Sequence, residues 1–137
     1  MRLFRHLLSP MVRALRTAEL LTKGLEKKLH VQEALREWRI GDWEAKLWRE
    51  TPKPFDTNED PPNGETRLAF EERVIGVVAS CLQAARGRST LFVSHGAVAH
   101  TLLTYLAIDV PYIKNAKIYK VYPVDQHWHL SERPQRL

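Results

Sequence analysis

Hydrophobic positions along the chain fall into strand-like runs and helix-like spacings that follow one another in order. Residues 3–8, LFRHLL, predict a strand, and the segment that follows predicts a helix capped by Ser9, started by Pro10 and ended by Gly24. KLHVQ, residues 28–32, predicts another short strand. The beginning of the chain is therefore predicted as strand, helix and strand.

The next segment has no single periodicity. Trp38, Trp43 and Trp48 in EALREWRIGDWEAKLWRE do not follow one helical stripe, which predicts an irregular segment that then becomes helical. Four prolines within residues 51–66 block regular structure. Loops of this length are usually functional, so we expect this one to act as a lid.

The second half of the chain predicts helix, strand and helix, followed by two strands. Apolar side chains over residues 70–82 recur at helical spacing, and Gly87 supplies the stop. STLFVS, residues 89–94, is a continuous apolar run typical of a parallel strand covered on both faces. Residues 98–106 continue as a helix, and residues 116–132 predict two strands around a Pro-Val-Asp-Gln turn. We therefore predict an α/β fold with a mostly parallel sheet and helices on both faces.

Composition narrows the class of protein. A chain of 137 residues with 44% hydrophobic content predicts one globular domain over residues 1–137. The only cysteine, Cys81, cannot form an intrachain disulfide, and no apolar run approaches the length of a membrane span, so we expect a cytoplasmic protein without a membrane segment. The net charge of +5 favours anionic partners, either phosphorylated small molecules or nucleic acids.

Two predicted strand-to-helix junctions carry candidate chemistry. Ligands of open α/β sheets bind at the carboxyl ends of the strands, and His95 lies at such an end, where Gly96 lets the backbone come close to a bound group. The alternative is a histidine that only caps the helix. At the other junction, Arg13 lies near a helix amino terminus, where a cation either binds an anion or is exposed to water.

Four motifs, SPMVRALRTAELL, LREWRIGDWE, PPNGETRLAFEERV and LFVSHGAVAHTLL, occur in the order found in the histidine phosphatase superfamily, also called phosphoglycerate mutase-like. The chain resembles this family from about Leu7 to its end. GDWE and PPNGET are similar to the corresponding segments of α-ribazole phosphatases. The resemblance implies a phosphoglycerate mutase-like fold and a phosphomonoesterase or mutase activity.

The resemblance also implies roles for individual residues. Arg13 is similar to the family's second phosphate-binding arginine, His95 to its second pocket histidine, and Glu37 to the acid that protonates the leaving group. Glu65 and Thr66 match a motif at the pocket rim. The implied chemistry is phosphoryl transfer from a phosphate monoester to a histidine nitrogen, followed by hydrolysis, with no metal and no cofactor.

Independently of the family, a buried carboxylic acid can keep the proton that a departing alkoxide needs. Glu37 and Glu44 both qualify, and a solvated surface carboxylate is the alternative for each. The LRE context favours Glu37.

The family's Arg-His-Gly strand, which supplies the nucleophilic histidine and the first phosphate-binding arginine, is missing from this sequence. LFRHLLSP contains Arg5 and His6, but Leu7 replaces the glycine. In one interpretation residues 1–8 are the family's second strand, so both residues are coincidental; in the other a deletion has joined two strands, and Arg5 and His6 keep their roles. At ~3.3 Å for each strand residue, His6 would lie about 10 Å below Ser9, which favours the first.

Three functions follow as hypotheses. The first is a phosphate-monoester enzyme, the second a phosphate-binding or self-assembling protein without catalysis, and the third, ranked lowest, a nucleic-acid-binding protein that uses Trp128 with His127 or His129. Loss of the first strand would leave its neighbours with unpaired backbone groups. Strand exchange between two copies, closure of the sheet or a partner's strand would each fill the gap, and we predict a homo-oligomer. His127 and His129 without a third ligand make a poor metal site.

Overall fold

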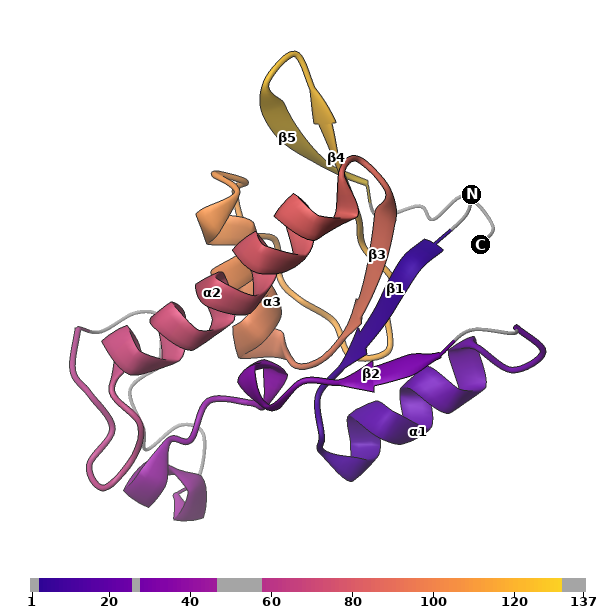
Figure 1. Cartoon of the computed structure of the whole chain (residues 1–137). Coiled ribbons are helices and arrows are strands. Elements are labelled where there is room, and N and C mark those ends of the chain that lie inside the picture. Colours follow the sequence, from indigo (N-terminus) through magenta and orange to yellow (C-terminus); the bar gives the residue numbers. More distant parts are fainter. Residues whose placement is uncertain (1–2, 26–27, 47–57, 132–137) are drawn as a thin grey trace.

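A parallel sheet of three strands lies at the centre of the computed structural model, which describes residues 3–25, 28–46 and 58–131 (Figure 1). Its strands, in the order β2-β1-β3, are β1 (Leu3–Leu8), β2 (Leu29–Val31) and β3 (Ser89–Val93). β1 pairs in parallel with both neighbours. The three strands lie where the sequence predicts them, and the predicted α/β class with a mostly parallel sheet is confirmed.

Helices cover both faces of this sheet, as predicted (Figure 1). They are α1 (Val12–Leu21), α2 (Arg67–Ala85) and α3 (Gly96–Tyr105). Successive side chains of a strand point to opposite faces. Leu7 accordingly packs in one core cluster with residues of α2 and α3, whereas Leu8 packs in another with residues of α1.

The boundaries of α2 agree closely with the predicted ones. Thr66 caps its amino terminus by accepting a hydrogen bond from the backbone N–H of Ala69 at 3.2 Å. The helix ends at Ala85, and Arg86 and Gly87 follow with left-handed φ values of 48° and 80°. The predicted stop at Gly87 is thus the turn that leads into β3.

The start of α1 differs from the prediction. Met11 is the N-cap and receives no side-chain cap, so the prediction that Ser9 caps this helix was wrong. Ser9 is completely buried, and its Oγ accepts a hydrogen bond from the backbone N–H of Met11 at 3.3 Å, before the helix begins. At the other end the helix stops at Leu21, and Gly24 lies in the following turn with a φ of 82°.

The irregular middle segment contains two short 3₁₀ helices, η1 (Glu33–Leu35) and η2 (Gly41–Ala45). Residues 58–66 form a loop without regular structure, as expected. The rest of the predicted lid, residues 51–57, and the helical continuation around Trp48 fall outside the described residues.

The end of the described chain forms an antiparallel hairpin that is separate from the main sheet. It consists of β4 (Lys120–Val124) and β5 (His127–Ser131), and Figure 1 shows it projecting from one end of the molecule. Asp125 and Gln126 have φ values of 48° and 67°, which suits a tight two-residue turn. Both strands were predicted, but β4 continues through Pro123 and Val124, which the prediction had placed in the turn.

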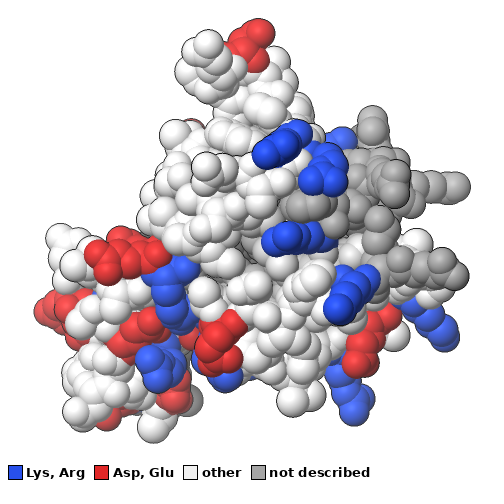
Figure 2. Space-filling view, in the orientation of Figure 1, with Lys and Arg blue, Asp and Glu red and all other residues white. Residues whose placement is uncertain are grey.

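Charged side chains are unevenly distributed over the surface. In Figure 2 most acidic side chains gather at the end of the molecule that carries η2 and the start of α2, with some Lys and Arg side chains among them, and other Lys and Arg side chains are spread from the end of α2 to α1. None of the helices in the described part of the chain is both long enough and apolar enough to span a membrane.

Candidate functional site

All three strands of the sheet deliver their carboxyl ends to one edge. Leu8 at the end of β1 is in register with Val31 of β2 and Val93 of β3. Backbone hydrogen bonds continue one residue further, since Ser9 N–H donates to the Val93 carbonyl at 2.9 Å and Gln32 N–H to the Leu8 carbonyl at 2.8 Å. The segments that follow the strands therefore leave from the same level, where ligands of open α/β sheets bind.

His95 lies two residues after the end of β3 and is the boundary residue before α3. It occupies the N-cap position, but its side chain makes no capping hydrogen bond. Instead its Nε2 lies 2.7 Å from the hydroxyl Oγ of Ser9, which follows β1. The imidazole thus joins the two strand-to-helix junctions and does more than cap α3.

The electrostatic surroundings keep His95 neutral. Its pKa is lowered to about 4, first by burial and then by the positive charges of Arg13, Arg36 and Arg73. Only 9% of the residue is exposed. At neutral pH the ring is therefore uncharged, and it both accepts and donates hydrogen bonds.

The hydroxyl of Ser9 orients His95 and does not face solvent. A separation of 2.7 Å would suit a nucleophile and its base. Ser9 is, however, completely buried and is also bonded to the backbone of Met11, so its Oγ cannot meet a substrate.

Arg13 lies in the first turn of α1, at the same edge of the sheet. Its residue is exposed, and its positive charge lowers the pKa of both His95 and Glu37. Arg13, His95 and Glu37 come from three separate segments, and the positive charge of Arg13 acts on both of the other two groups.

Glu37 follows η1, and its surroundings favour the protonated form of its carboxyl more than water does. Burial raises the pKa of its carboxyl, and this effect exceeds the opposing ones of the N–H of Trp38, the charge of Arg13, the N–H of Ala97 and the charge of Arg73. The Trp38 N–H donates to Oε1 at 3.0 Å. Because Ala97 lies in the first turn of α3, the carboxyl is at the amino terminus of that helix.

Glu44, the other candidate acid, lies on η2 with an exposed side chain. Burial therefore distinguishes the two carboxylic acids in favour of Glu37.

Gly96, the first residue of α3, is exposed, and a Cβ added to it would meet nothing within 4 Å. The start of α3 is thus open to the approach of an anion.

His6 and Arg5 do not lie at this edge. His6 is completely buried within β1, in register with Leu29 and Leu91, and alternation places it on the same face as Leu8, toward α1. Arg5 is exposed and lies on the opposite face. The position of His6 inside the sheet agrees with the interpretation that residues 1–8 correspond to the family's second strand.

Glu65 and Thr66 support the site from the start of α2. The carboxylate of Glu65 accepts two hydrogen bonds from Arg73, at 2.6 Å and 2.9 Å. Burial acts to raise the pKa of Glu65, but the hydrogen bond and charge of Arg73 outweigh it, so the pKa is lowered. Thr66 caps the helix, and a role for either residue at a pocket rim stays a prediction.

Two glycines bring the GDWE and PPNGET motifs into backbone contact. Asp42 N–H donates to the Pro62 carbonyl at 2.9 Å, and Glu65 N–H to the Arg39 carbonyl at 2.7 Å. A Cβ on Gly41 would lie 2.2 Å from the Pro62 oxygen, and one on Gly64 would lie 2.6 Å from the Arg39 oxygen. Only glycine fits at either position, and their contact fixes where Glu65 lies.

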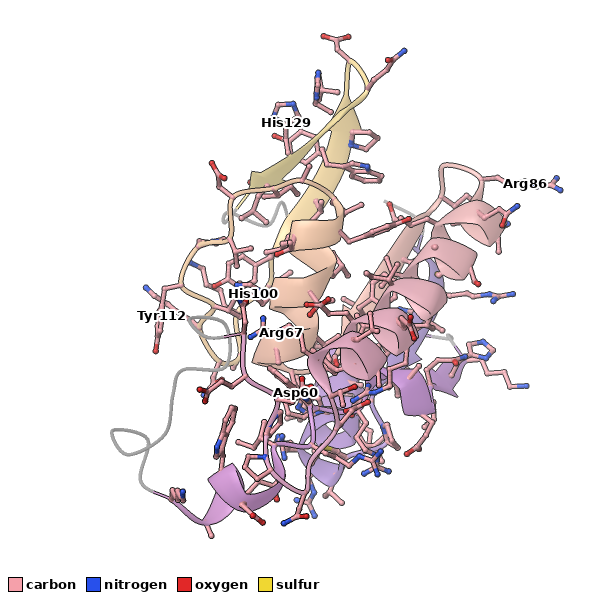
Figure 3. The ribbon with its side chains drawn as sticks, turned by 90° about the vertical axis from the view of Figure 1, so that its left-hand side faces the viewer. Asp60, Arg67, Arg86, His100, Tyr112 and His129 are labelled. Carbon is pink, nitrogen blue, oxygen red and sulfur yellow. The ribbon has the colours of Figure 1, made fainter. Side chains whose placement is uncertain are left out.

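The remaining histidines lie elsewhere. Figure 3 shows His100 beside Arg67 on the helical side of the molecule and His129 on the hairpin. Burial, and then the charge of Arg67, lowers the pKa of His100. His127 and His129 are exposed on β5, and among the residues that the structure describes no group of three or more His, Cys, Asp or Glu side chains is placed to hold a metal ion.

Sequence reasoning missed Ser9, Ser94 and Arg73 as parts of this site. Ser94 donates its hydroxyl to the Leu35 carbonyl at 2.6 Å, and Arg73 donates to the backbone of residues 34–37. The available signal for Arg73 was an arginine next to the buried face of a predicted amphipathic helix. Ser9 and Ser94 offered no signal beyond their places after strands.

The fold and the site together define an α/β protein in which Arg13, His95 with a lowered pKa and Glu37 with a raised pKa all lie in segments that follow the strands of a parallel sheet. The sequence profile of the Histidine phosphatase superfamily (branch 1) matches residues 2–133, and the chain belongs to this family. The predicted membership is thereby confirmed.

Individual relatives agree with this assignment. The uncharacterized phosphatase PhoE of Bacillus subtilis is 32% identical over 110 residues, which cover 80% of this chain and 56% of that protein, so the chain spans little more than half of this relative. The alpha-ribazole phosphatase of Shigella flexneri has a similar structure, with a TM-score of 0.73 and 21% identity over 96% of this chain and 73% of that one. A mycobacterial glucosyl-3-phosphoglycerate phosphatase with inorganic phosphate gives a TM-score of 0.76 and 20% identity, over 95% and 76%. The similarity to these two structures concerns the fold alone.

Proposed function

We propose that this chain binds the phosphoryl group of a phosphate monoester at the carboxyl edge of its sheet. The observation that carries the proposal is the junction at the start of α3, where the buried His95 contacts Ser9 and where Gly96 is exposed with open space around it. The charge of Arg13 acts on His95 and Glu37 there. Arg13 and the backbone N–H groups of α3 would bind phosphoryl oxygens. Family membership, and a relative solved with inorganic phosphate, support this class of ligand.

Each side chain has a distinct part in the proposed reaction. A bound dianion favours the protonated imidazole, so His95 takes up a proton when the ligand binds and then stabilises the developing charge. In the first step the phosphoryl group moves from the ester oxygen to a nitrogen of the nucleophilic histidine, for which His6 is the candidate. The leaving oxygen takes the proton of Glu37. In the second step water attacks the phosphorus, the P–N bond breaks, and the Glu37 carboxylate accepts the proton of the water.

Phosphate binding without turnover is the second candidate function. The buried position of His6 favours it, because a nucleophilic nitrogen has to reach the phosphorus and His6 points into the core on the α1 side. In this form Arg13 and the start of α3 hold the anion, and no covalent step takes place.

Isothermal calorimetry with inorganic phosphate tests the binding common to both functions. We expect Arg13→Ala to weaken binding at least about tenfold, because it removes a charge-assisted contact. Arg16→Ala, which removes an exposed arginine from the next turn of α1, should leave the affinity unchanged. Equal effects of the two variants, or no binding by the unaltered protein, would refute the proposed site.

Hydrolysis of p-nitrophenyl phosphate then separates the two functions. Turnover that is lost in both His6→Ala and Glu37→Gln supports the enzyme with His6 as its nucleophile. Phosphate binding with no turnover above the rate of the uncatalysed reaction supports the second function.

We also propose that two copies of the chain associate through the outer edge of β3. Among the described strands β3 pairs only with β1, and the β4–β5 hairpin forms a sheet of its own. An edge strand offers a row of backbone groups to a second strand. Light scattering should give twice the mass of one chain, and one chain mass at high concentration would refute this proposal.

A further inference from the structure

The segment that carries Glu37 is held by hydrogen bonds to four consecutive carbonyls of its backbone. The guanidinium of Arg73 donates hydrogen bonds to the carbonyls of Ala34, Arg36 and Glu37, at 2.7, 2.8 and 3.2 Å. The remaining carbonyl, that of Leu35, accepts the Ser94 hydroxyl at 2.6 Å. Side chains from α2 and from the β3–α3 junction therefore bond every carbonyl of residues 34–37.

The orientation of Arg73 is itself fixed on its other side. Its two remaining N–H groups donate to the Glu65 carboxylate, at 2.6 Å and 2.9 Å, so all five guanidinium donors are used. The backbone of Glu65 is bonded in turn, because its carbonyl accepts the indole N–H of Trp38 at 2.8 Å and its N–H donates to Arg39 at 2.7 Å. The planar fork of an arginine suits this task, and a lysine cannot reproduce it.

We propose that Arg73 and Ser94 are positioning residues that hold the Glu37 carboxyl at the start of α3, a proposal that rests on the proposed role of Glu37 as the acid. Ser94 is the residue directly before His95, so its hydrogen bond ties the segment of the acid to the junction that carries the histidine. Arg73 ties the same segment to the rigid helix α2. Residues on separate elements thereby keep a constant relative position.

The surroundings of Glu37 predict what happens when this support is removed. Arg13 on α1 and Arg73 on α2 act on its carboxyl with their charges, the backbone N–H of Ala97 in the first turn of α3 also acts to lower its pKa, and His95 lies at the start of the same helix. Burial nevertheless dominates and raises its pKa. A segment that is held less tightly lets water reach the carboxyl, so the pKa should fall.

Carbon-13 NMR titration of the Glu side-chain carboxyls, with Glu37 assigned by comparison with Glu37→Gln, measures this directly and needs no turnover. We expect Ser94→Ala to lower the pKa of Glu37 toward the ordinary value, because water then reaches the carboxyl. Arg73→Lys should lower it further, since one ammonium cannot bond three carbonyls and a carboxylate at once. In the enzyme, both variants should reduce kcat with little change in KM and shift the upper limb of the pH profile.

Thr22→Val is the matched control. It removes another buried hydroxyl that donates to a backbone carbonyl, that of Ala18 at 2.8 Å, at the far end of α1. The pKa of Glu37 should be unchanged in this variant. An unchanged pKa in folded Ser94→Ala would overturn the proposal, and this single variant decides the matter if Arg73→Lys does not fold. Failure of the unaltered protein to bind phosphate would instead refute the proposed function, whatever the carboxyl does.

Discussion

Two segments of this molecule deliver catalytic-type side chains to the same place in different ways. Residues 93–96 pass from a strand into a helix, and the backbone bonds of β3 and α3 place His95. Residues 34–37 have a short 3₁₀ turn and no strand partner, and side chains of Arg73 and Ser94 place Glu37. Regular structure positions a residue by its own hydrogen bonds, whereas an irregular segment depends on donors that are distant in the sequence.

The largest expected change in stability comes from a substitution at the contact between Gly41 and Gly64, next to the irregular segment. Gly64→Ala puts a Cβ 2.6 Å from the Arg39 oxygen and 2.9 Å from the Gly41 nitrogen, so backbone has to move. We expect the free energy of unfolding to fall by about 2 to 4 kcal/mol in urea titrations. Gly76→Ala is the control, because a Cβ there meets nothing within 4 Å in the middle of α2, and it should stabilise the protein by about 0.5 to 1 kcal/mol. Similar losses in both variants would contradict this explanation.

The junction between β3 and α3 should make the free energy of unfolding depend on pH, because it carries His95. Between the ordinary pKa of about 6.5 and the folded value of about 4, the unfolded chain binds a proton at His95 that the folded chain does not bind. Stability therefore falls as the pH is lowered through this window, and His95→Gln, which cannot titrate, lacks this contribution. The difference in unfolding free energy between the two proteins should change by about 2 kcal/mol from pH 6.5 to pH 4. Parallel stability curves would show that the pKa of His95 is not lowered.

The smallest expected change is at Gly96. Open space around the position means that Gly96→Ala should alter the unfolding free energy by less than about 1 kcal/mol. A methyl group over the start of α3 should nevertheless hinder a bound anion, and we expect phosphate affinity to fall about threefold to tenfold in calorimetry. If Gly96→Ala binds phosphate as tightly as the unaltered protein, the anion binds away from this helix.

The sequence alone predicts most of the fold because the regular elements follow local rules. The apolar run at residues 89–94, the helical spacing over residues 70–82 and the Ser-His-Gly junction all depend on neighbouring residues. Arg13, His95 and Glu37 were predicted partly by family resemblance, and their roles stay a prediction; the charge of Arg13 acts to lower the pKa of both other groups.

The features that escaped prediction depend on contacts between distant segments. Ser9 was predicted as a helix cap because the local sequence shows only its place before a helix. Its hydrogen bond to His95 joins residues 86 positions apart, which no local pattern reveals. Arg73 and residues 34–37 lie 36 to 39 positions apart, and no local pattern records such a pairing. The hairpin turn lies later in the chain than predicted, because β4 contains Pro123. Proline is tolerated there since, among the described strands, β4 pairs only with β5 and is an edge strand.

The contact between Gly41 and Gly64 has a consequence for how proteins with this architecture diversify. Because the backbones of the two glycines touch, the two ends of the stretch between them stay at a fixed distance from each other. An insertion between the glycines that keeps this contact should leave Glu65, and with it the hydrogen bonds of Arg73 to the segment of Glu37, in place. New recognition properties can thus evolve between the two glycines while these hydrogen bonds stay the same.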